Sequence, residues 1–258
     1  MALTVAVAGK GGVGKTTFAA LVIRELILKN LKPVLAVDAD PNSNLNIFLG
    51  INVYRTVGSL REEALERVKK MDFPEGMSKV MYMEYGFQEC IAEGDGFDLL
   101  VMGRPEGPGC YCFANDILRS FIDKLSPNYR YVVIDTEAGM EHLSRRTTRN
   151  VDVLFIISDK NPVSLRAAER INNLVEELKL KIGRRYLVLN MQNFSSSESL
   201  KQKLKGTNLK LAGTVPQDSE VFSCAIEEKP VFSLSPSSPA VSAVRKILED
   251  TGVIEKNT

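Results

Sequence analysis

The sequence predicts an α/β fold with a mostly parallel, doubly wound sheet and helices on both faces, forming a single domain over residues 1–258. Short β-branched runs alternate with amphipathic stretches along the chain, and this alternation is typical of parallel strands joined by helices. No internal repeat, low-complexity tract or linker marks a second domain. A hydrophobic content of 44% and a charged content of 25% are typical of a folded globular protein.

The predicted strands are short apolar runs rich in Val, Ile and Leu. They cover residues 4–8, 34–37, 98–102, 131–134, 153–157, 186–189 and 209–215. The clearest helix follows Asn161, which we expect to be its N-cap, with Pro162 as its first residue. Two further helices are predicted over residues 18–29 and 113–125.

Residues 57–96 break this alternation, and we expect an insertion there that packs over the sheet edge. The insertion contains a charged helical piece, residues 59–70, and a piece rich in Met and Tyr, residues 77–90. Thioethers are soft metal ligands, but they more often fill irregular gaps in a core. We therefore expect the methionines of this region to pack beneath the insertion; they are Met71, Met77, Met81 and Met83.

Charge and cysteine content narrow the class of protein. The net charge of +1 and the short C-terminal segment of mixed charge do not predict a surface that binds nucleic acid or a membrane. No signal-peptide pattern is present at the start, and no apolar run approaches the roughly 20 residues that span a bilayer. We therefore expect a cytoplasmic protein whose four cysteines are reduced.

A glycine-rich loop follows the first predicted strand and leads into a helix, and it fits the pattern G-x-x-x-x-G-K-[ST]. Glycines allow backbone N–H groups to converge on phosphate oxygens, and the helix N-terminus adds positive potential. We expect Lys15 to reach the β and γ phosphates of ATP or ADP, and the Thr16 hydroxyl to bind Mg²⁺. A merely flexible turn is the alternative. The expected phosphate-binding residues are Gly9, Gly11, Gly12, Val13, Gly14, Lys15, Thr16 and Thr17.

The additional lysine at position 10 makes the segment KGGVGKT resemble the deviant Walker A family. That family includes the MinD and ParA ATPases of cell division and partition and the nitrogenase iron protein. The resemblance implies a P-loop ATPase that forms a nucleotide-sandwich homodimer. In such a dimer Lys10 would reach the phosphates of the partner chain, where a cation stabilises the charge that develops during hydrolysis. A solvated loop lysine is the alternative.

Two strand ends complete the resemblance. The segment DADPN, residues 38–42, resembles switch I, which implies that Asp40 orients the attacking water and that Asp38 contacts Mg²⁺ through water. The segment DTEAG, residues 135–139, resembles switch II and implies that Asp135 is the Walker B carboxylate. Ligands bind at the carboxyl ends of parallel strands, which favours these roles. Capping of the following segments by Asp38 and Asp135 is the alternative.

The same resemblance implies a binding site for the adenine base. Asn190 ends the predicted strand YLVLN, and Pro216, Gln217 and Asp218 follow the last predicted strand. These positions match those that contact adenine in relatives of this kind. A turn-forming role for Asn190 is the alternative.

Two thiols one residue apart occur in GPGCYC, residues 107–112. Cys110 and Cys112 supply two ligands, whereas a tetrahedral or square-planar metal site built from thiolates takes four. A twofold dimer would supply the other two, because it places the same loop of each chain across its axis. The alternatives are buried small side chains or a strained local disulfide. The isolated Cys90 and Cys224 are expected to be core thiols.

Together, KGGVGKTT, DADPN, the C-x-C pair and DTEAGMEHL resemble the CooC-type ATPases that mature nickel enzymes. CooC-type proteins serve carbon monoxide dehydrogenase, and AcsF-type relatives serve acetyl-CoA synthase. The resemblance implies a homodimer that binds Ni²⁺ and uses ATP to deliver it to such a client. Two alternatives stay open: an iron-protein-like ATPase that carries an iron–sulfur cluster for electron transfer, and a ParA/MinD-type partitioning ATPase. His142, the only histidine, is expected to have a packing role.

Overall fold

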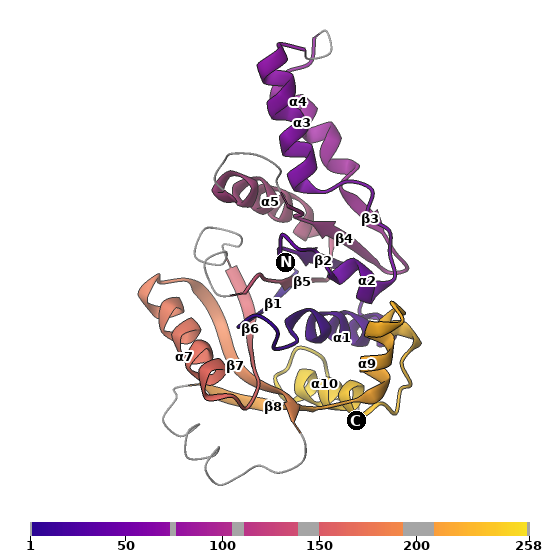
Figure 1. The fold of residues 1–258 in the computed structure, drawn as a ribbon, viewed down its shortest axis with the longest axis vertical. Coiled ribbons are helices and arrows are strands. Elements are labelled where there is room, and N and C mark those ends of the chain that lie inside the picture. The colour runs from indigo at the N-terminus through magenta and orange to yellow at the C-terminus, as the bar shows by residue number, and fades with distance from the viewer. Residues whose placement is uncertain (1, 73–75, 105–110, 139–149, 193–208, 257–258) are drawn as a thin grey trace.

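The structure is a computed structural model, and it describes residues 2–72, 76–104, 111–138, 150–192 and 209–256 (Figure 1). The strands are β1 (Leu3–Gly9), β2 (Val34–Asp38), β3 (Ile91–Glu93), β4 (Phe97–Val101), β5 (Tyr131–Asp135), β6 (Asn150–Ser158), β7 (Lys181–Gln192) and β8 (Lys210–Pro216). The α-helices are α1 (Lys15–Leu28), α2 (Leu45–Leu49), α3 (Val57–Lys70), α4 (Lys79–Gln88), α5 (Tyr111–Leu125), α7 (Pro162–Glu177), α9 (Ser219–Ile226) and α10 (Pro239–Asp250). Two 3₁₀ turns are η1 (Ser126–Asn128) and η2 (Val231–Ser233).

The described strands form one sheet with the order β3-β4-β2-β5-β1-β6-β7-β8. All neighbouring pairs are parallel except β3 and β4, which are antiparallel. The predicted fold class is thus confirmed, and each predicted strand lies within or overlaps an observed one. The edge strand β3 was not predicted, because three residues are too few to show a periodic pattern.

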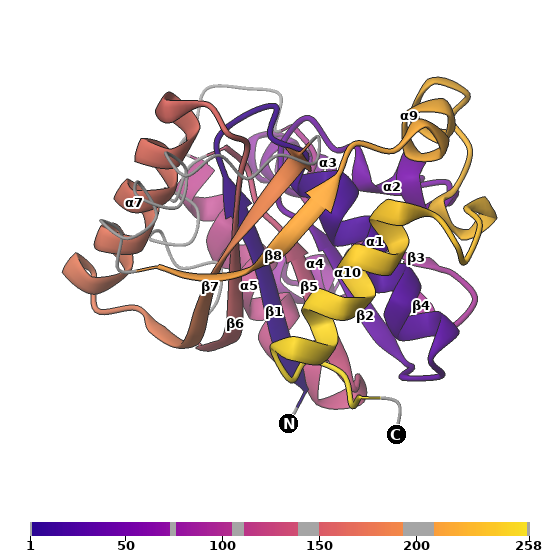
Figure 2. The ribbon, with the colours of Figure 1, turned by 90° about the horizontal axis from the view of Figure 1, so that it is seen from below.

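Helices cover both faces of the sheet (Figure 2). Side chains alternate between the two faces of a strand, so β1 sends Val5 and Val7 into one apolar cluster and Ala6 and Ala8 into the other. The first cluster includes buried residues of α1 and α10, and the second includes buried residues of α5 and α7. Helix α7 begins as predicted: Pro162 is its first residue, and the Asn161 side chain accepts a hydrogen bond of 2.9 Å from the backbone N–H of Val163.

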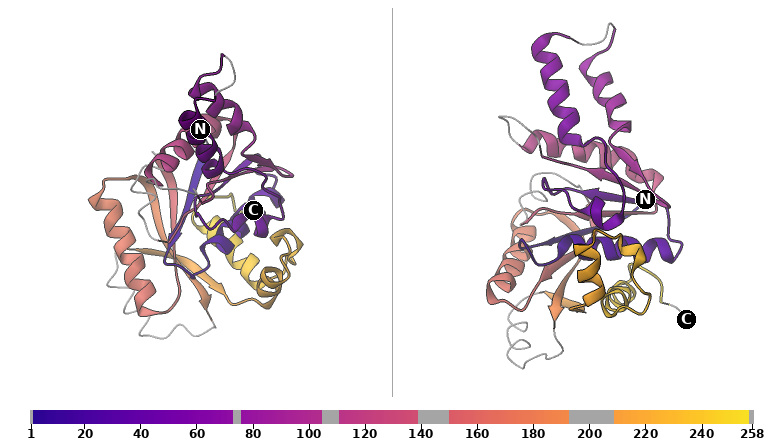
Figure 3. Two further views of the ribbon diagram at one scale, coloured as in Figure 1. Left: turned by 45° about the horizontal axis from the view of Figure 1, so that its top comes forward. Right: turned by 45° about the vertical axis from the view of Figure 1, so that its right-hand side comes forward.

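Helices α3 and α4, which we call the arm, project from the body of the molecule beyond β4 and α5 (Figures 1 and 3). The same segment also adds to the sheet edge, since β3 pairs with β4. The expectation that the methionines fill a core is wrong for Met71 and Met81, which are 91% and 42% exposed. Met83 does pack, partly buried, against the second apolar cluster.

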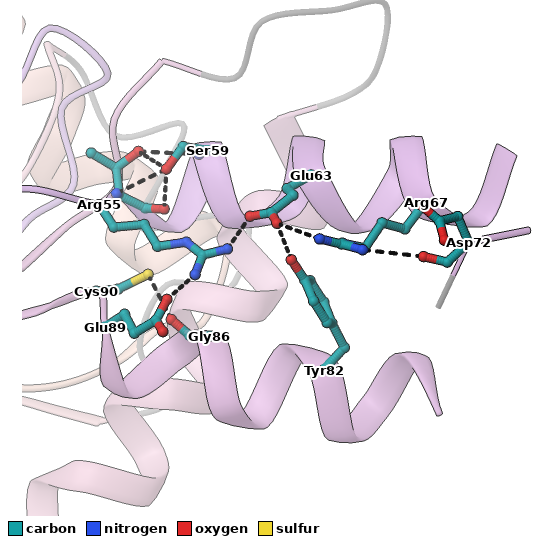
Figure 4. A network of polar contacts seen from close by, with 10 residues as sticks. Arg55, Ser59, Glu63, Arg67, Asp72, Tyr82, Gly86, Glu89 and Cys90 are labelled. Carbon is teal, nitrogen blue, oxygen red and sulfur yellow. Dashed lines mark hydrogen bonds and ion pairs between the residues drawn. The ribbon is translucent and has the colours of Figure 1, made fainter. Parts of the chain in front are cut away.

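A polar network joins the two helices of the arm (Figure 4). Arg55 at its base forms ion pairs with both Glu63 and Glu89. The Tyr82 hydroxyl of α4 donates to Glu63 of α3, and this hydrogen bond lowers the pKa of Glu63. The guanidinium of Arg67 lies 5.0 Å from the centre of the Tyr82 ring. These charged and aromatic contacts add to the apolar packing of Leu60 in α3 and Phe87 in α4, which both belong to the second apolar cluster.

Candidate functional site: a phosphate loop between two buried carboxylates

The carboxyl ends of three adjacent central strands meet at the site. Strand β1 leads into the glycine-rich loop, β2 ends at Asp38 and β5 ends at Asp135. The strand registers pair Asp135 with Val7 of β1 and with Asp38 of β2. Parallel pairing therefore places both carboxylates at the edge of the sheet where the glycine-rich loop begins, which is the usual ligand-binding edge of such sheets.

Three glycines of the glycine-rich loop have a positive φ. Gly9 has a φ of 155°, and a Cβ there would lie 2.4 Å from the carbonyl oxygen of Ile157, so only glycine fits. Gly14 has a φ of 88° and is the N-cap of α1. Lys15 is the first residue of α1 and only 7% exposed, and its Nζ lies 3.4 Å from the carbonyl oxygen of Lys10. Lys10 itself is exposed, and its ammonium has no hydrogen-bond or ion-pair partner among the described residues.

Asp38 is fully buried and accepts two backbone hydrogen bonds. One of its oxygens accepts from the N–H of Asp40 at 3.1 Å, and the other accepts from the N–H of Leu45, the first residue of α2, at 3.0 Å. Asp38 thus also caps the start of α2, and its contact with Mg²⁺ through water stays a prediction. Burial nevertheless raises the pKa of Asp38 to about 6.

Asp135 is 1% exposed, and its Oδ1 has no hydrogen-bond partner among the residues that the structure describes. Burial raises the pKa of this carboxyl to about 7, a hydrogen bond with Thr16 opposes the rise, and the nearby Asp38 adds to it. A buried carboxylate oxygen without a partner is costly, and a divalent cation relieves that cost. The unpartnered oxygen beside the Thr16 hydroxyl therefore fits a Mg²⁺ site.

Asp135→Asn is expected to change how stability depends on pH in the nucleotide-free protein. The pKa of Asp135 is about 7 in the folded chain against an ordinary 3.8. The contribution of this carboxyl to the free energy of unfolding is therefore fully present below pH 3.8 and is lost as pH rises through 7. The amide does not titrate, so the stability of the variant relative to wild type should increase by about 2–3 kcal/mol between pH 5 and pH 8. Urea unfolding at both pH values measures this difference. An unchanged difference would show that Asp135 is not protonated at pH 5.

A cavity of about 580 Å³ opens over the glycine-rich loop. Its walls come from the loop, switch I, switch II, α2 and α9. Asp40 lies in the wall, and its Oδ1 accepts hydrogen bonds from Asn42, at 2.9 Å from the backbone N–H and at 3.2 Å from the side-chain amide. No sequence motif indicated several other wall residues, because only the tertiary fold brings α2 and α9 to the loop; they are Asn44, Ile47, Phe48, Ala225, Glu228 and Lys229.

A second, largely apolar pocket of about 270 Å³ adjoins this cavity and shares Thr17 and Ala225 with it. All residues predicted to contact adenine line this pocket: Asn190, Pro216, Gln217 and Asp218. Asn190 belongs to β7, so the turn-forming alternative is wrong, and its side-chain amide donates to the carbonyl oxygen of Val13 at 2.8 Å. Asp218 is also structural, since it caps α9 through the N–H of Glu220 and accepts a hydrogen bond of 2.6 Å from Ser238.

The predicted metal ligands fall largely outside the described residues. Cys110 lies in an undescribed segment, and Cys112 is in the first turn of α5 with a side chain that is not described. His142, for which a packing role is expected, also lies outside the described residues. Cys90 and Cys224 are buried thiols, as expected, and burial raises the pKa of Cys90 to about 12. Within the described part of the chain, no cluster of three His, Cys, Asp or Glu side chains could hold a metal. Nor does that part contain a helix long and apolar enough to cross a bilayer.

A glycine-rich loop between a parallel strand and a helix, flanked by two buried strand-end carboxylates, defines a P-loop nucleotide-binding protein. The chain belongs to the CobQ/CobB/MinD/ParA nucleotide-binding-domain family, whose sequence profile matches residues 4–231. It is accordingly a P-loop ATPase.

Comparison with individual proteins gives three further likenesses. An uncharacterized ATP-binding protein of Methanocaldococcus jannaschii is 43% identical over 247 residues, which cover 96% of this chain and 97% of that protein. The carbon monoxide dehydrogenase accessory protein CooC of Rhodospirillum rubrum is 32% identical over 190 residues, or 69% of this chain and 71% of that protein. The solved structure of MinD from Pyrococcus horikoshii with Mg-ADP has a TM-score of 0.71 at 19% identity, covering 97% of this chain and 96% of that chain. This last likeness concerns the fold alone.

Proposed function

We propose that this ATPase is a nickel metallochaperone: a homodimer that binds Ni²⁺ between Cys110 and Cys112 of two chains and inserts it into carbon monoxide dehydrogenase or acetyl-CoA synthase. The observation that carries the proposal is the 32% identity to the carbon monoxide dehydrogenase accessory protein CooC. The C-x-C pair supports it, because two chains together supply the four thiolates that a tetrahedral or square-planar site takes.

The phosphate site would act as a deviant Walker A site. Lys15 binds the β and γ phosphates, and Lys10, exposed on the loop, reaches the phosphates of the partner chain. Thr16 and Asp135 would hold Mg²⁺, with Asp38 beside them, and the bound ion neutralises charge on the phosphates. Asp40 lies in the cavity wall, where it orients the attacking water.

The adenine base would occupy the apolar pocket beside the phosphate cavity. Asn190, Pro216, Gln217 and Asp218 line that pocket, and its shared wall with the cavity allows one nucleotide to fill both. The hydrogen bond from Asn190 to Val13 connects the base pocket to the phosphate loop. Binding of the base would therefore favour one arrangement of that loop.

Delivery of the metal would follow from the dimer geometry. A nucleotide that changes how two chains face each other alters all four thiolates together, and this changes their affinity for Ni²⁺. Zn²⁺ also binds thiolates, so affinity alone would not identify the metal. A cytoplasmic location agrees with reduced thiols.

The direct test is nickel binding by the pair of cysteines. Wild type, loaded anaerobically with Ni²⁺, is expected to bind one ion per dimer, and Cys110→Ser/Cys112→Ser is expected to bind none at the same concentration. Added ADP or ATP should change the wild-type affinity. Metal analysis combined with solution mass measures both stoichiometry and oligomeric state. Cys90→Ser is the matched control, since Cys90 is a buried thiol and should not affect binding.

Two results would contradict the proposal. Equal nickel binding in wild type and the double variant would mean that these cysteines are not the ligands. A brown wild-type protein after anaerobic purification, with visible absorption that the double variant lacks, would favour the iron–sulfur alternative.

A further inference from the structure

The segment that leaves β4, residues 102–104, lies between switch I and the base of the arm. The backbone N–H of Met102 donates to the carbonyl oxygen of Asp38 at 2.8 Å. The carbonyl oxygen of Met102 accepts from the N–H of Gly58, at the start of α3, also at 2.8 Å. This segment is therefore held on one side by the strand that carries switch I and on the other by the arm.

The next residue restricts the path of the chain further. Gly103 has a φ of 67°, and a Cβ there would lie 2.4 Å from Oγ1 of Thr56. Thr56 is itself fixed, because it and Ser59 form the capping box of α3. The backbone that leads into Arg104 thus has little conformational freedom, and this fixes the point from which the exposed Arg104 side chain extends.

Arg104 reaches from this position to switch I. Its Nη2 donates to the side-chain oxygen of Asn42 at 3.3 Å. Asn42 in turn donates its side-chain and backbone N–H groups to Oδ1 of Asp40. A guanidinium, an amide and a carboxylate thus form a chain, in which the cation orients the amide and polarises its N–H toward Asp40.

We propose that Arg104 is a positioning residue for ATP hydrolysis, which acts through Asn42 to hold the Asp40 carboxylate in one orientation. The inference rests on the role proposed above for Asp40. A carboxylate that orients water must keep its own position, and small displacements of such a group reduce turnover strongly. Because Arg104 lies outside the cavity wall, it affects the chemical step rather than nucleotide binding.

The test separates kcat from KM for MgATP. Arg104→Ala is expected to lower kcat roughly tenfold and to leave KM within about twofold, since ground-state contacts with the nucleotide do not change. Arg104→Lys, which keeps a cation and a donor, should recover part of the loss. If Arg104 acts through Asn42, the double variant Arg104→Ala/Asn42→Ala should be no slower than Asn42→Ala alone. Arg166→Ala, on the exposed side of α7, is the matched control.

The outcomes distinguish this inference from the role of Asp40. An inactive Asp40→Asn with a fully active Arg104→Ala would overturn the positioning role only. An active Asp40→Asn would overturn the role of Asp40 and this inference together. An effect of Arg104→Ala on KM rather than on kcat would also overturn the positioning role. So would a decrease in kcat that adds fully to the decrease caused by Asn42→Ala. Thermal melting of every variant confirms that a loss of turnover is not a loss of folding.

Discussion

Lys15→Ala is expected to weaken binding of MgADP and MgATP by about 100-fold or more. Lys15 starts α1, is almost fully buried, and has its ammonium over the glycine-rich loop, 3.4 Å from the Lys10 carbonyl oxygen. Alanine removes the positive charge that we place against the β and γ phosphates bound by the same chain. Isothermal titration calorimetry with each nucleotide measures the loss, and thermal melting verifies the fold.

Lys10→Ala provides the matched comparison, because it removes the same kind of side chain five residues away in the same loop. Its ammonium is exposed, so nucleotide binding by the monomer should stay within about twofold of wild type. Turnover should nevertheless be lost, since the partner's phosphates lack their additional cation. Normal hydrolysis by Lys10→Ala would contradict the trans role of this lysine, and normal binding by Lys15→Ala would contradict the phosphate site.

Asp40→Asn is expected to reduce kcat by about 100-fold and to leave nucleotide affinity nearly unchanged. In wild type, Oδ1 of Asp40 accepts a hydrogen bond of 2.9 Å from the backbone N–H of Asn42. The asparagine keeps an oxygen that can accept this bond, so switch I should keep its local structure. What it loses is the negative charge that would orient the attacking water. Phosphate release at saturating MgATP, together with calorimetric binding, measures the two effects separately.

Asp95→Asn is the control for that experiment, since Asp95 is exposed in the turn between β3 and β4. It removes one carboxylate charge at a distance from the cavity and should leave kcat unchanged. A large loss of affinity in Asp40→Asn, instead of a loss of turnover, would mean that Asp40 contributes to binding of the nucleotide rather than to its hydrolysis.

Sequence patterns predicted the fold and the phosphate site for local physical reasons. A buried parallel strand must be apolar on both faces, which makes runs such as β2 and β5 visible without a structure. Gly9 of the phosphate loop is required by backbone geometry, as its close approach to Ile157 shows. Asp38 and Asp135 were identified because each ends one of these strands.

Other features depend on contacts that no local pattern records. Arg104 and Asn42 meet across 62 residues of sequence, and their contact exists only because the exit of β4 is held against switch I. Met71 and Met81 are exposed. The apolar contacts of the arm come instead from Leu60, Met83 and Phe87, and Glu63 and its partners add polar contacts. Helical periodicity alone does not show which apolar side chains of such a helix pair become buried.

The two buried carboxyls of the proposed phosphate site would also make proton uptake part of the nucleotide cycle. With pKa values of about 6 and 7, Asp38 and Asp135 retain protons in the empty site at a pH where ordinary carboxyls have lost them. A cation bound in the proposed way would require them ionised, so each arrival of a metal–nucleotide complex would release protons and each departure would take protons up again. A shift of the surrounding pH toward acidity would thus lower the apparent affinity for the metal–nucleotide complex.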